Sequence, residues 1–547
     1  MKRKAGDTAE RADGGQTGAK LLRLLAALIL VNVLLLAPAW VLAGGVGAPL
    51  FAVEAGVVIG IFALLPRRRW TLAAAALVAL ALVFITVVGL GNTAALMSLA
   101  RPLNLYVDFW LLSAVHNLLA GTLGGAVSTL VILLALAAGS LLIGLLTYLL
   151  APTGEPHSAR FTRVGALFLI VFVTLGLTAP RVPALALRVD APAVDLSIQQ
   201  VLRFYEMTGE RGRFAEDLAE ARDSYADLPG LLSRLDGSDV ILAFVESYGV
   251  AALYDPRYGP VVGPRLDDLE TRVEDAGLHL VSGRLVAPSQ GGQSWFGHGS
   301  TLSGLWLDNQ LRYDMMLAEG RETLIDDFEH AGYRTVALMP AITTAWPEGE
   351  RFGYEKVFAR KDIEYAGPPL NWVTMPDQFS WSFLEHSIRK GDERPVFAEL
   401  GLISSHAPWT PILPVLEDWD SIGDGAIFAP WENAGERPED LWLDTERVRE
   451  HYAMSVEYAV HAMAAYAGRY VDDRTLLIVL GDHQPAPLIT GNDAPWEVPV
   501  HVISGDSTLL TPFKDWGFVP GAWPDTDSAA LGMDYFRDWF VRAYSTP

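Results

Sequence analysis

The sequence predicts a helical membrane bundle followed by a doubly wound α/β/α sandwich. Long apolar runs are confined to the first third of the 547 residues, and short β-branched strands alternate with amphipathic helices after Asp239. The charge divides at the same place: residues 1–181 contain 13 Lys and Arg against 6 Asp and Glu, whereas the remainder contains 28 against 58. These patterns indicate one chain adapted to two solvents.

Five apolar runs are long enough to cross a bilayer. We expect a transmembrane domain at 21–180, after a cytoplasmic tail at 1–20. A sixth run, 105–121, is interrupted by Asp108 and His116 and carries aromatic residues that favour an interface-lying helix. Glu54, inside the second run, is either functional or close to the outer interface. The five predicted spans are 21–43, 49–65, 71–90, 127–151 and 163–179.

Basic residues predict the orientation of these spans. The clusters Lys2–Lys4, Arg67–Arg69 and Arg160–Arg163 all fall on one side, which is the cytoplasmic side by the positive-inside rule. An odd number of spans then places residues 231–547 outside the cytoplasm, joined by linker helices at 181–230. A sixth span at 105–121 would reverse this placement.

Composition also excludes several functions. The acidic excess after residue 181 repels nucleic acid, so we expect no nucleic-acid partner. Since the chain has no cysteine, disulfides, thiolate zinc sites and a cysteine nucleophile are all excluded.

The alternating pattern of the second part predicts a parallel sheet wrapped by helices. Ligands of such sheets bind beyond the carboxyl ends of the strands. The expected strands are Asp239–Val245, Arg334–Met339, Pro395–Ile403, Thr475–Leu480 and Val498–Ser504, and the expected helices lie near 264–276, 321–332, 379–390 and 445–470.

Polar side chains follow three of these strands. Glu246 follows the first strand, His406 the third, and Asp482-His483 the fourth. Carboxylate oxygens with one imidazole suit a divalent cation, so Glu246, Asp482 and His483 are the candidate metal ligands.

A candidate nucleophile lies in a glycine-rich turn. Gly291-Gly292 precedes Ser294, which begins an expected helix at 294–305. Free amides at a helix start suit a phosphate, and a cation that binds Ser294 makes its hydroxyl reactive. His298, one turn later, is positioned to contact the phosphate or the acceptor, and His406 to bind a phosphate oxygen or protonate the leaving alcohol.

These motifs resemble the alkaline phosphatase and sulfatase superfamily, especially its membrane-anchored lipoteichoic acid synthases, phosphoglycerol transferases and phosphoethanolamine transferases. The resemblance covers about residues 235–510. It rests on Val-Glu-Ser-Tyr-Gly at Glu246, on Ser294, on Ser-Ser-His-Ala-Pro-Trp at His406 and on Leu-Gly-Asp-His at 482–483. Trp346 and Arg351 lie near the family's glycerol-phosphate contacts, although with different spacing.

The resemblance implies an alkaline-phosphatase-like fold with one catalytic divalent ion, Mn²⁺ before Zn²⁺ or Mg²⁺. It further implies a phosphoserine intermediate, a membrane phospholipid donor and an envelope glycan or lipid acceptor at the outer face of a bacterial inner membrane. Phosphoglycerol-type transfer or hydrolysis is therefore the expected activity.

Departures from the family pattern separate the alternatives. Serine replaces the commoner threonine at 294, and the chain lacks the disulfides usual in phosphoethanolamine transferases. Ser294 is followed by Trp-Phe-Gly-His, not by the Pro-x-Arg that formylglycine sulfatases need. A phosphoethanolamine transferase, another sulfatase-family hydrolase and a catalytically silent envelope-binding protein stay open as alternatives. For each residue a structural role is the competing hypothesis, such as a cap for Glu246 or packing for His298.

Overall fold

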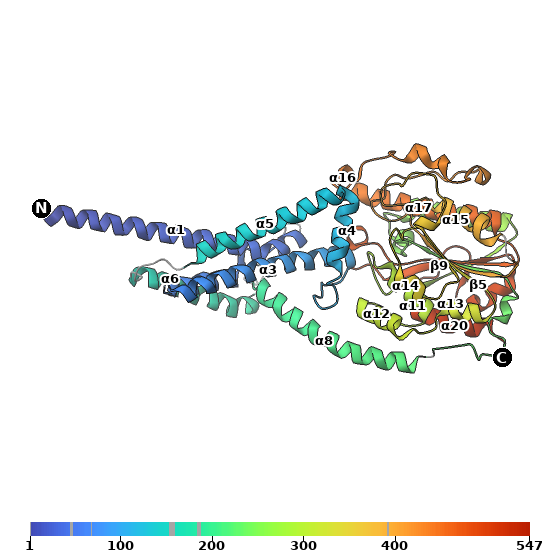
Figure 1. Cartoon of the computed structure of the whole chain (residues 1–547), viewed down its shortest axis with the longest axis horizontal. Helices are drawn as coiled ribbons and strands as arrows, with labels where there is room; N and C mark the ends of the chain where they lie inside the picture. Colours follow the sequence, from blue (N-terminus) through green and yellow to red (C-terminus); the bar gives the residue numbers. More distant parts are fainter. Residues whose placement is uncertain are drawn as a thin grey trace. The chain divides into compact units, whose positions relative to one another are not determined.

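The structure is a computed structural model that describes residues 2–43, 48–66, 68–151, 159–182, 188–221, 223–390 and 393–546. The chain forms two compact units (Figure 1). The first contains Met1–Met97 and Arg101–Glu210, and the second contains Ser98–Ala100 and Arg211–Pro547. The division after Glu210 falls inside the helix α8 (Pro192–Glu220).

The first unit is helical, and three of its described helical segments are long and apolar enough to cross a membrane. They are Lys20–Leu42 within α1 (Lys2–Leu42), α3 (Arg69–Leu99) and α5 (Gly125–Leu150). The prediction of five spans is therefore wrong for the described residues. The second and fifth runs form shorter apolar helices, α2 (Val53–Leu64) and residues Thr162–Thr178 of α6 (Ala159–Thr178).

Local structure explains why the helix α2 is shorter than the apolar run that contains it. Phe51 and Ala52 form the strand β1, which pairs in parallel with β2 (Val189–Asp190), and α2 ends at Leu64, before Pro66. The 12 residues of α2 rise only about 18 Å, whereas the hydrocarbon core is about 30 Å thick. The run at 105–121 overlaps α4 (Leu111–Leu123), and its interfacial position stays a prediction.

The short helix α2 packs closely against α6. A Cβ atom at Gly56 would lie 1.9 Å from Cγ of Phe172, and one at Gly60 would lie 3.0 Å from Cβ of Leu169. Small residues four apart let two apolar helices approach in this way. Glu54 has a structural role here, because its Oε1 accepts the backbone N–H groups of Ala193 and Val194 in the first turn of α8.

The second unit is built on a mixed nine-stranded sheet of order β10-β4-β9-β8-β3-β7-β5-β6, with β11 paired to β4. Parallel pairing joins β8, β3, β7, β5 and β6, whereas β9 is antiparallel to both β8 and β4. The strands are β3 (Asp239–Val245), β4 (His279–Val286), β5 (Arg334–Met339), β6 (Lys356–Ala359), β7 (Val396–Leu402), β8 (Thr475–Gly481), β9 (Glu497–Ser504), β10 (Val519–Pro520) and β11 (Leu531–Gly532).

The expected all-parallel sheet is thus corrected to a mixed one. Between β8 and β9 the chain forms only the four-residue helix α18 (Pro487–Thr490), so no crossover helix returns β9 to the parallel direction. The strand β4 was not predicted, because Ser282, Gly283 and Arg284 interrupt its apolar pattern.

Helices cover both faces of the sheet (Figure 1). On one face α10, α15 and α17 pack on the side chains of Ile241, Ala243 and Val245 in β3. On the other face α11, α12, α13 and α20 pack on those of Val240, Leu242 and Phe244. The helices of this unit are α9 (Ala251–Tyr254), α10 (Gly259–Asp275), α11 (Ser294–Ser303), α12 (Gln310–Glu319), α13 (Leu324–His330), α14 (Pro347–Arg351), α15 (Asp377–Phe383), α16 (Pro438–Leu441), α17 (Thr445–Tyr470), α18, α19 (Thr511–Asp515) and α20 (Phe536–Tyr544).

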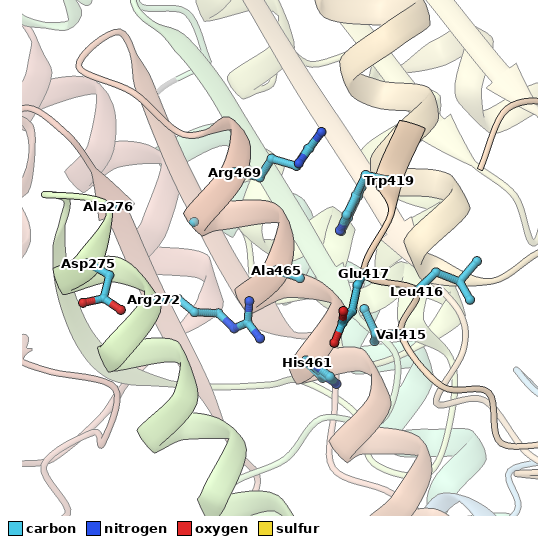
Figure 2. Close-up of a pocket in the computed structure, with 11 residues that line it drawn as sticks. Arg272, Asp275, Ala276, Val415, Leu416, Glu417, Trp419, His461, Ala465 and Arg469 are labelled. Atoms are coloured by element: carbon cyan, nitrogen blue, oxygen red, sulfur yellow. The ribbon is translucent and has the colours of Figure 1, made fainter. Parts of the chain in front are cut away.

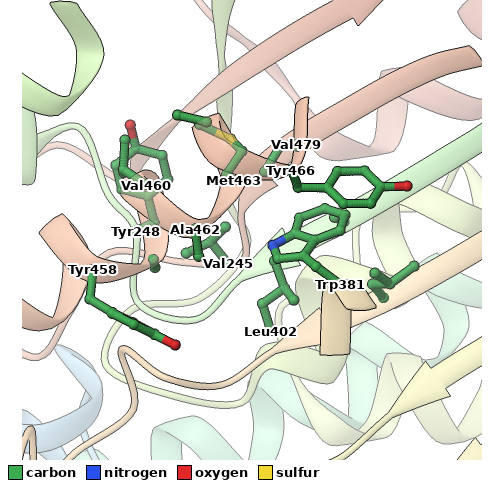
Figure 3. Packing of buried hydrophobic residues seen from close by; sticks show 14 of the residues in the cluster. Val245, Tyr248, Trp381, Leu402, Tyr458, Val460, Ala462, Met463, Tyr466 and Val479 are labelled. Atoms are coloured by element: carbon green, nitrogen blue, oxygen red, sulfur yellow. The ribbon is translucent and has the colours of Figure 1, made fainter. Parts of the chain in front are cut away.

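Aromatic packing fixes α15 and α17 over the first face (Figure 3). The rings of Trp381 and Tyr466 stack with centroids 4.5 Å apart, and Val245, Leu402 and Val479 from three neighbouring strands lie in the same cluster. Since these strands end beside one another, this core holds the carboxyl ends of β3, β7 and β8 in a fixed register.

Candidate metal centre and nucleophile

Glu246 and Asp482 lie together because their strands are neighbours in register. Val245 of β3 pairs with Gly481 of β8, so the residue after each strand emerges at the same level. Asp482 Oδ1 accepts the backbone N–H groups of Ser247 and His483, each at 2.7 Å. These two bonds fix the carboxylate and leave Oδ2 to face His483 Nε2, 3.7 Å away.

His483 presents Nε2 to the two carboxylates. Its Nδ1 donates to the backbone oxygen of Gln484 at 2.9 Å, so the lone pair of the neutral ring lies on Nε2. That atom is 3.3 Å from Glu246 Oε1. The ligand atoms of Glu246, Asp482 and His483 all lie within 4.8 Å of one another, and the three residues form the one such group found in the described part of the chain.

The charges of this cluster fit a cation. Burial and the Glu246 carboxylate raise the pKa of Asp482 to about 7. Burial opposes charge on His483, but Asp482 and Glu246 outweigh it and raise the pKa of His483 to about 9. Burial would likewise raise the pKa of Glu246, yet the adjacent His483 holds that pKa well below its usual range. The buried Asp482 and the partly buried Glu246 thus require a positive charge, which either a protonated His483 or a divalent cation provides.

Ser294 lies at this cluster. Its hydroxyl donates to Glu246 Oε2 at 3.2 Å, and its Oγ is 3.3 Å from His483 Nε2. The preceding turn has positive φ at Gly291, Gly292 and Gln293 (75°, 145° and 65°), which explains the paired glycines. Ser294 is the first residue of α11, so the helix starts at the site as the sequence predicts.

The two other predicted histidines come from different elements. His406 is exposed in the turn after β7, where its Nδ1 donates to the backbone oxygen of Ala407 at 2.5 Å, and its charge contributes to the low pKa of Glu246. Asp377 shapes this turn by accepting the N–H groups of Ile403 and Ser404. His298, one turn after Ser294 on α11, contacts Glu399 of β7, with 2.6 Å between Nδ1 and Oε1.

Trp346 directly precedes α14, Arg351 is the last residue of that helix, and both contact protein groups. Trp346 packs against Phe352 and Tyr354 with ring centroids 6.5 Å away in both cases, and Arg351 donates to the backbone oxygen of Leu317 at 3.1 Å. The structure places neither residue among the metal ligands, and their role in substrate binding stays a prediction.

The sequence prediction missed Glu399 and Asp377. Glu399 carried a usable signal, because it is the one charged residue in Val-Phe-Ala-Glu-Leu-Gly-Leu of β7. Asp377 carried none, since an acidic residue in the first turn of a helix is common.

A groove lies outside this site. It has a volume of about 540 Å³ and is lined by residues of α10, α17 and the segment 415–419 (Figure 2). Its two arginines are already paired, Arg272 with Asp268 and Arg469 with Asp420. None of the predicted site residues lines this groove.

No protein-family profile and no curated protein matches the chain. Several solved structures match the chain at low sequence identity. The lipoteichoic acid synthase LtaP of Listeria monocytogenes is 13% identical over 60% of this chain and 77% of its own, with a TM-score of 0.35. The Streptococcus pyogenes phosphoglycerol transferase GacH, in complex with sn-glycerol-1-phosphate, is 14% identical over 55% and 74%, with a TM-score of 0.33.

A third structure, of a Vibrio parahaemolyticus protein in the alkaline phosphatase superfamily, is 17% identical over 55% of this chain and 64% of its own, with a TM-score of 0.32. At these scores the likeness is distant and carries no argument, so the proposal below rests on the geometry of the site and on the sequence motifs.

Proposed function

We propose that this chain is a membrane-anchored, metal-dependent enzyme that transfers or hydrolyses a phosphate-ester head group through a covalent phosphoserine at Ser294. The main support is that Ser294 Oγ lies 3.2 Å from Glu246 Oε2 and 3.3 Å from His483 Nε2, where the ligand atoms converge. A silent binding protein has no need of a hydroxyl at that point.

Glu246, Asp482 and His483 would hold the cation, with Ser294 as the fourth ligand. When bound, a divalent cation supplies positive charge that favours the ionised serine and the phosphate oxygens. Mn²⁺ is the first expectation from the motif resemblance, and oxygen ligands with one imidazole also accept Zn²⁺ or Mg²⁺.

Two displacements complete the proposed reaction. Ser294 gives up its hydroxyl proton to water, and its Oγ attacks phosphorus in line. The bond to the leaving alcohol breaks while His406 gives that alcohol a proton. An acceptor alcohol or water then attacks the phosphoserine, and the P–Oγ bond breaks. The partial positive charge at the start of α11 would favour the phosphate in both steps.

The proposed substrate is a phosphoglycerol-type head group from a membrane phospholipid, passed to an envelope glycan or lipid. This choice rests on the motif resemblance and on three apolar helices that suit an anchor in a bilayer. The proposed location of the second unit is the outer face of a bacterial inner membrane. The three candidate spans are an odd number, which supports this proposed location.

Labelling can test this topology directly, since the chain has no cysteine. Single cysteines at exposed Lys390 and at Lys20 should react differently with a membrane-impermeant maleimide in intact cells: the first should label and the second should not. Labelling of Lys20→Cys alone would place the second unit in the cytoplasm.

Activity tests the chemistry. The purified full chain with Mn²⁺ and phosphatidylglycerol should release diacylglycerol, and Ser294→Ala should abolish the release. Ser303→Ala, at the far end of α11, is the matched control and should stay active, because its hydroxyl bonds only within that helix and its cap. Equal activity of Ser294→Ala and the parent would refute the proposed nucleophile.

A further inference from the structure

A buried carboxylate outside the metal cluster contacts the helix that carries Ser294. Glu399 lies in the middle of β7, paired with Leu242 of β3 and Ala337 of β5, and its side chain is 1% exposed. Burying a carboxylate among apolar strands costs free energy unless its oxygens are hydrogen-bonded. Both oxygens have partners: His298 Nδ1 lies 2.6 Å from Oε1, and the Tyr354 hydroxyl donates to Oε2.

Contacts on other sides restrict the ring of His298. It stacks on Phe244 with centroids 3.8 Å apart and an interplanar angle of 24°. Gly401 lies beside the ring, since a Cβ atom there would be 4.0 Å from its Cε1, an ordinary van der Waals distance. The stacking and the Nδ1 hydrogen bond together define one ring orientation.

This orientation also defines which nitrogen is free to react. A ring that donates from Nδ1 to a carboxylate has its lone pair on Nε2, as in the histidines that serve as bases in hydrolytic triads. The His298 side chain is 16% exposed although its Nδ1 partner is buried, so the accessible edge of the ring lies away from Glu399. An Nε2 that accepts a hydrogen bond suits a hydroxyl better than an anionic phosphate oxygen.

We propose that His298 is the base for the second displacement and that Glu399 and Tyr354 are positioning residues that act through it. This inference rests on the proposed function. Nε2 takes the proton of the acceptor hydroxyl as its oxygen bonds to phosphorus, and the P–Oγ bond to Ser294 breaks. The ligand assigned to this position is therefore an alcohol or water.

Comparing the rates of the two displacements in the parent and in variants tests this assignment. The full chain with Mn²⁺ and phosphatidylglycerol is quenched at short times, and diacylglycerol and phosphoserine are both quantified. In His298→Ala the first release of diacylglycerol should match the parent, whereas breakdown of the phosphoserine should slow by about 10²-fold, the lower end for a general base. The modified enzyme should accumulate.

Variants of the positioning residues should also slow the second displacement and leave the first unchanged, with a smaller effect than His298→Ala. Glu399→Gln and Tyr354→Phe should also accumulate phosphoserine, and Glu399→Gln should add nothing to His298→Ala, because non-additivity marks residues that act as one unit. Tyr333→Phe is the matched control: Tyr333 is buried on the same face of the sheet, and its hydroxyl has no hydrogen-bond partner among the described residues.

The outcomes separate this inference from the proposed function. If the parent forms no phosphoserine at Ser294, the proposed function fails. If the parent forms it but His298→Ala slows both displacements equally, or if Glu399→Gln and His298→Ala are additive, the assigned roles are wrong.

Discussion

Metal-free protein should lose stability as the pH rises from 7 to 8.5, because its cluster retains protons that the unfolded chain releases. Folding raises the pKa of Asp482 to about 7 and that of His483 to about 9, both above their ordinary values. A raised pKa contributes stability at low pH that disappears as the pH rises through the folded value. Between pH 7 and 8.5 the folded cluster holds about one proton more than the unfolded chain, chiefly on His483. The free energy of unfolding should therefore fall by ~1.4 kcal/mol per pH unit, or ~2 kcal/mol over the whole window.

Unfolding of the full chain with a chelator, followed by tryptophan fluorescence at pH 7.0 and 8.5, measures this loss. The double variant Asp482→Asn/His483→Gln should show little of it. His461→Gln is the matched control and should behave like the parent, because its pKa is lowered by burial and lies below the window. Mn²⁺ should abolish the loss, since a cation replaces the protons, so its stabilising effect should grow with pH. Equal stability of the metal-free parent at the two pH values would refute this reasoning.

Three further predictions concern stability. Burial lowers the pKa of His501 to about 3. The free energy of unfolding of the parent should therefore fall by up to ~1.4 kcal/mol per pH unit below pH 6.5 because of this group, and His501→Gln should not show this part of the loss. Urea unfolding at pH 6.5 and 5.0 measures the difference. Arg537→Met should lower the free energy of unfolding in urea by ~3–5 kcal/mol, because it leaves the fully buried Asp327 unpaired, and an added Asp327→Asn should recover part of the loss. Gly56→Leu should lower the melting temperature in detergent, because the new side chain would clash with the Phe172 ring. Gly139→Leu should not lower it, since a Cβ atom there meets nothing within 4 Å.

The sequence predicted the elements that are buried on both faces or strongly periodic. The strand β3 runs from Asp239 to Val245 and α17 from Thr445 to Tyr470, as expected, because continuous apolar residues and a 3.6-residue period are local signals. The glycine pair before Ser294 was also informative, since positive φ at Gly291 and Gly292 is a local requirement.

Features that depend on distant partners were not predictable in the same way. The direction of β9 depends on its pairing with β8 and β4, and the length of α2 depends on the pairing of Phe51 with Val189, 138 positions away. The sequence marks Glu399 as an unusual charge in an apolar strand, but its role depends on His298 and Tyr354, which contact its two oxygens.

Peptide mass spectrometry of the full chain, quenched during turnover of phosphatidylglycerol with Mn²⁺, tests the central claim most directly. We predict a phosphoglycerol adduct on the hydroxyl of Ser294, with no adduct in a Glu246→Gln variant that keeps the fold. Turnover with an unmodified Ser294, or an adduct carried by another residue, would contradict the account.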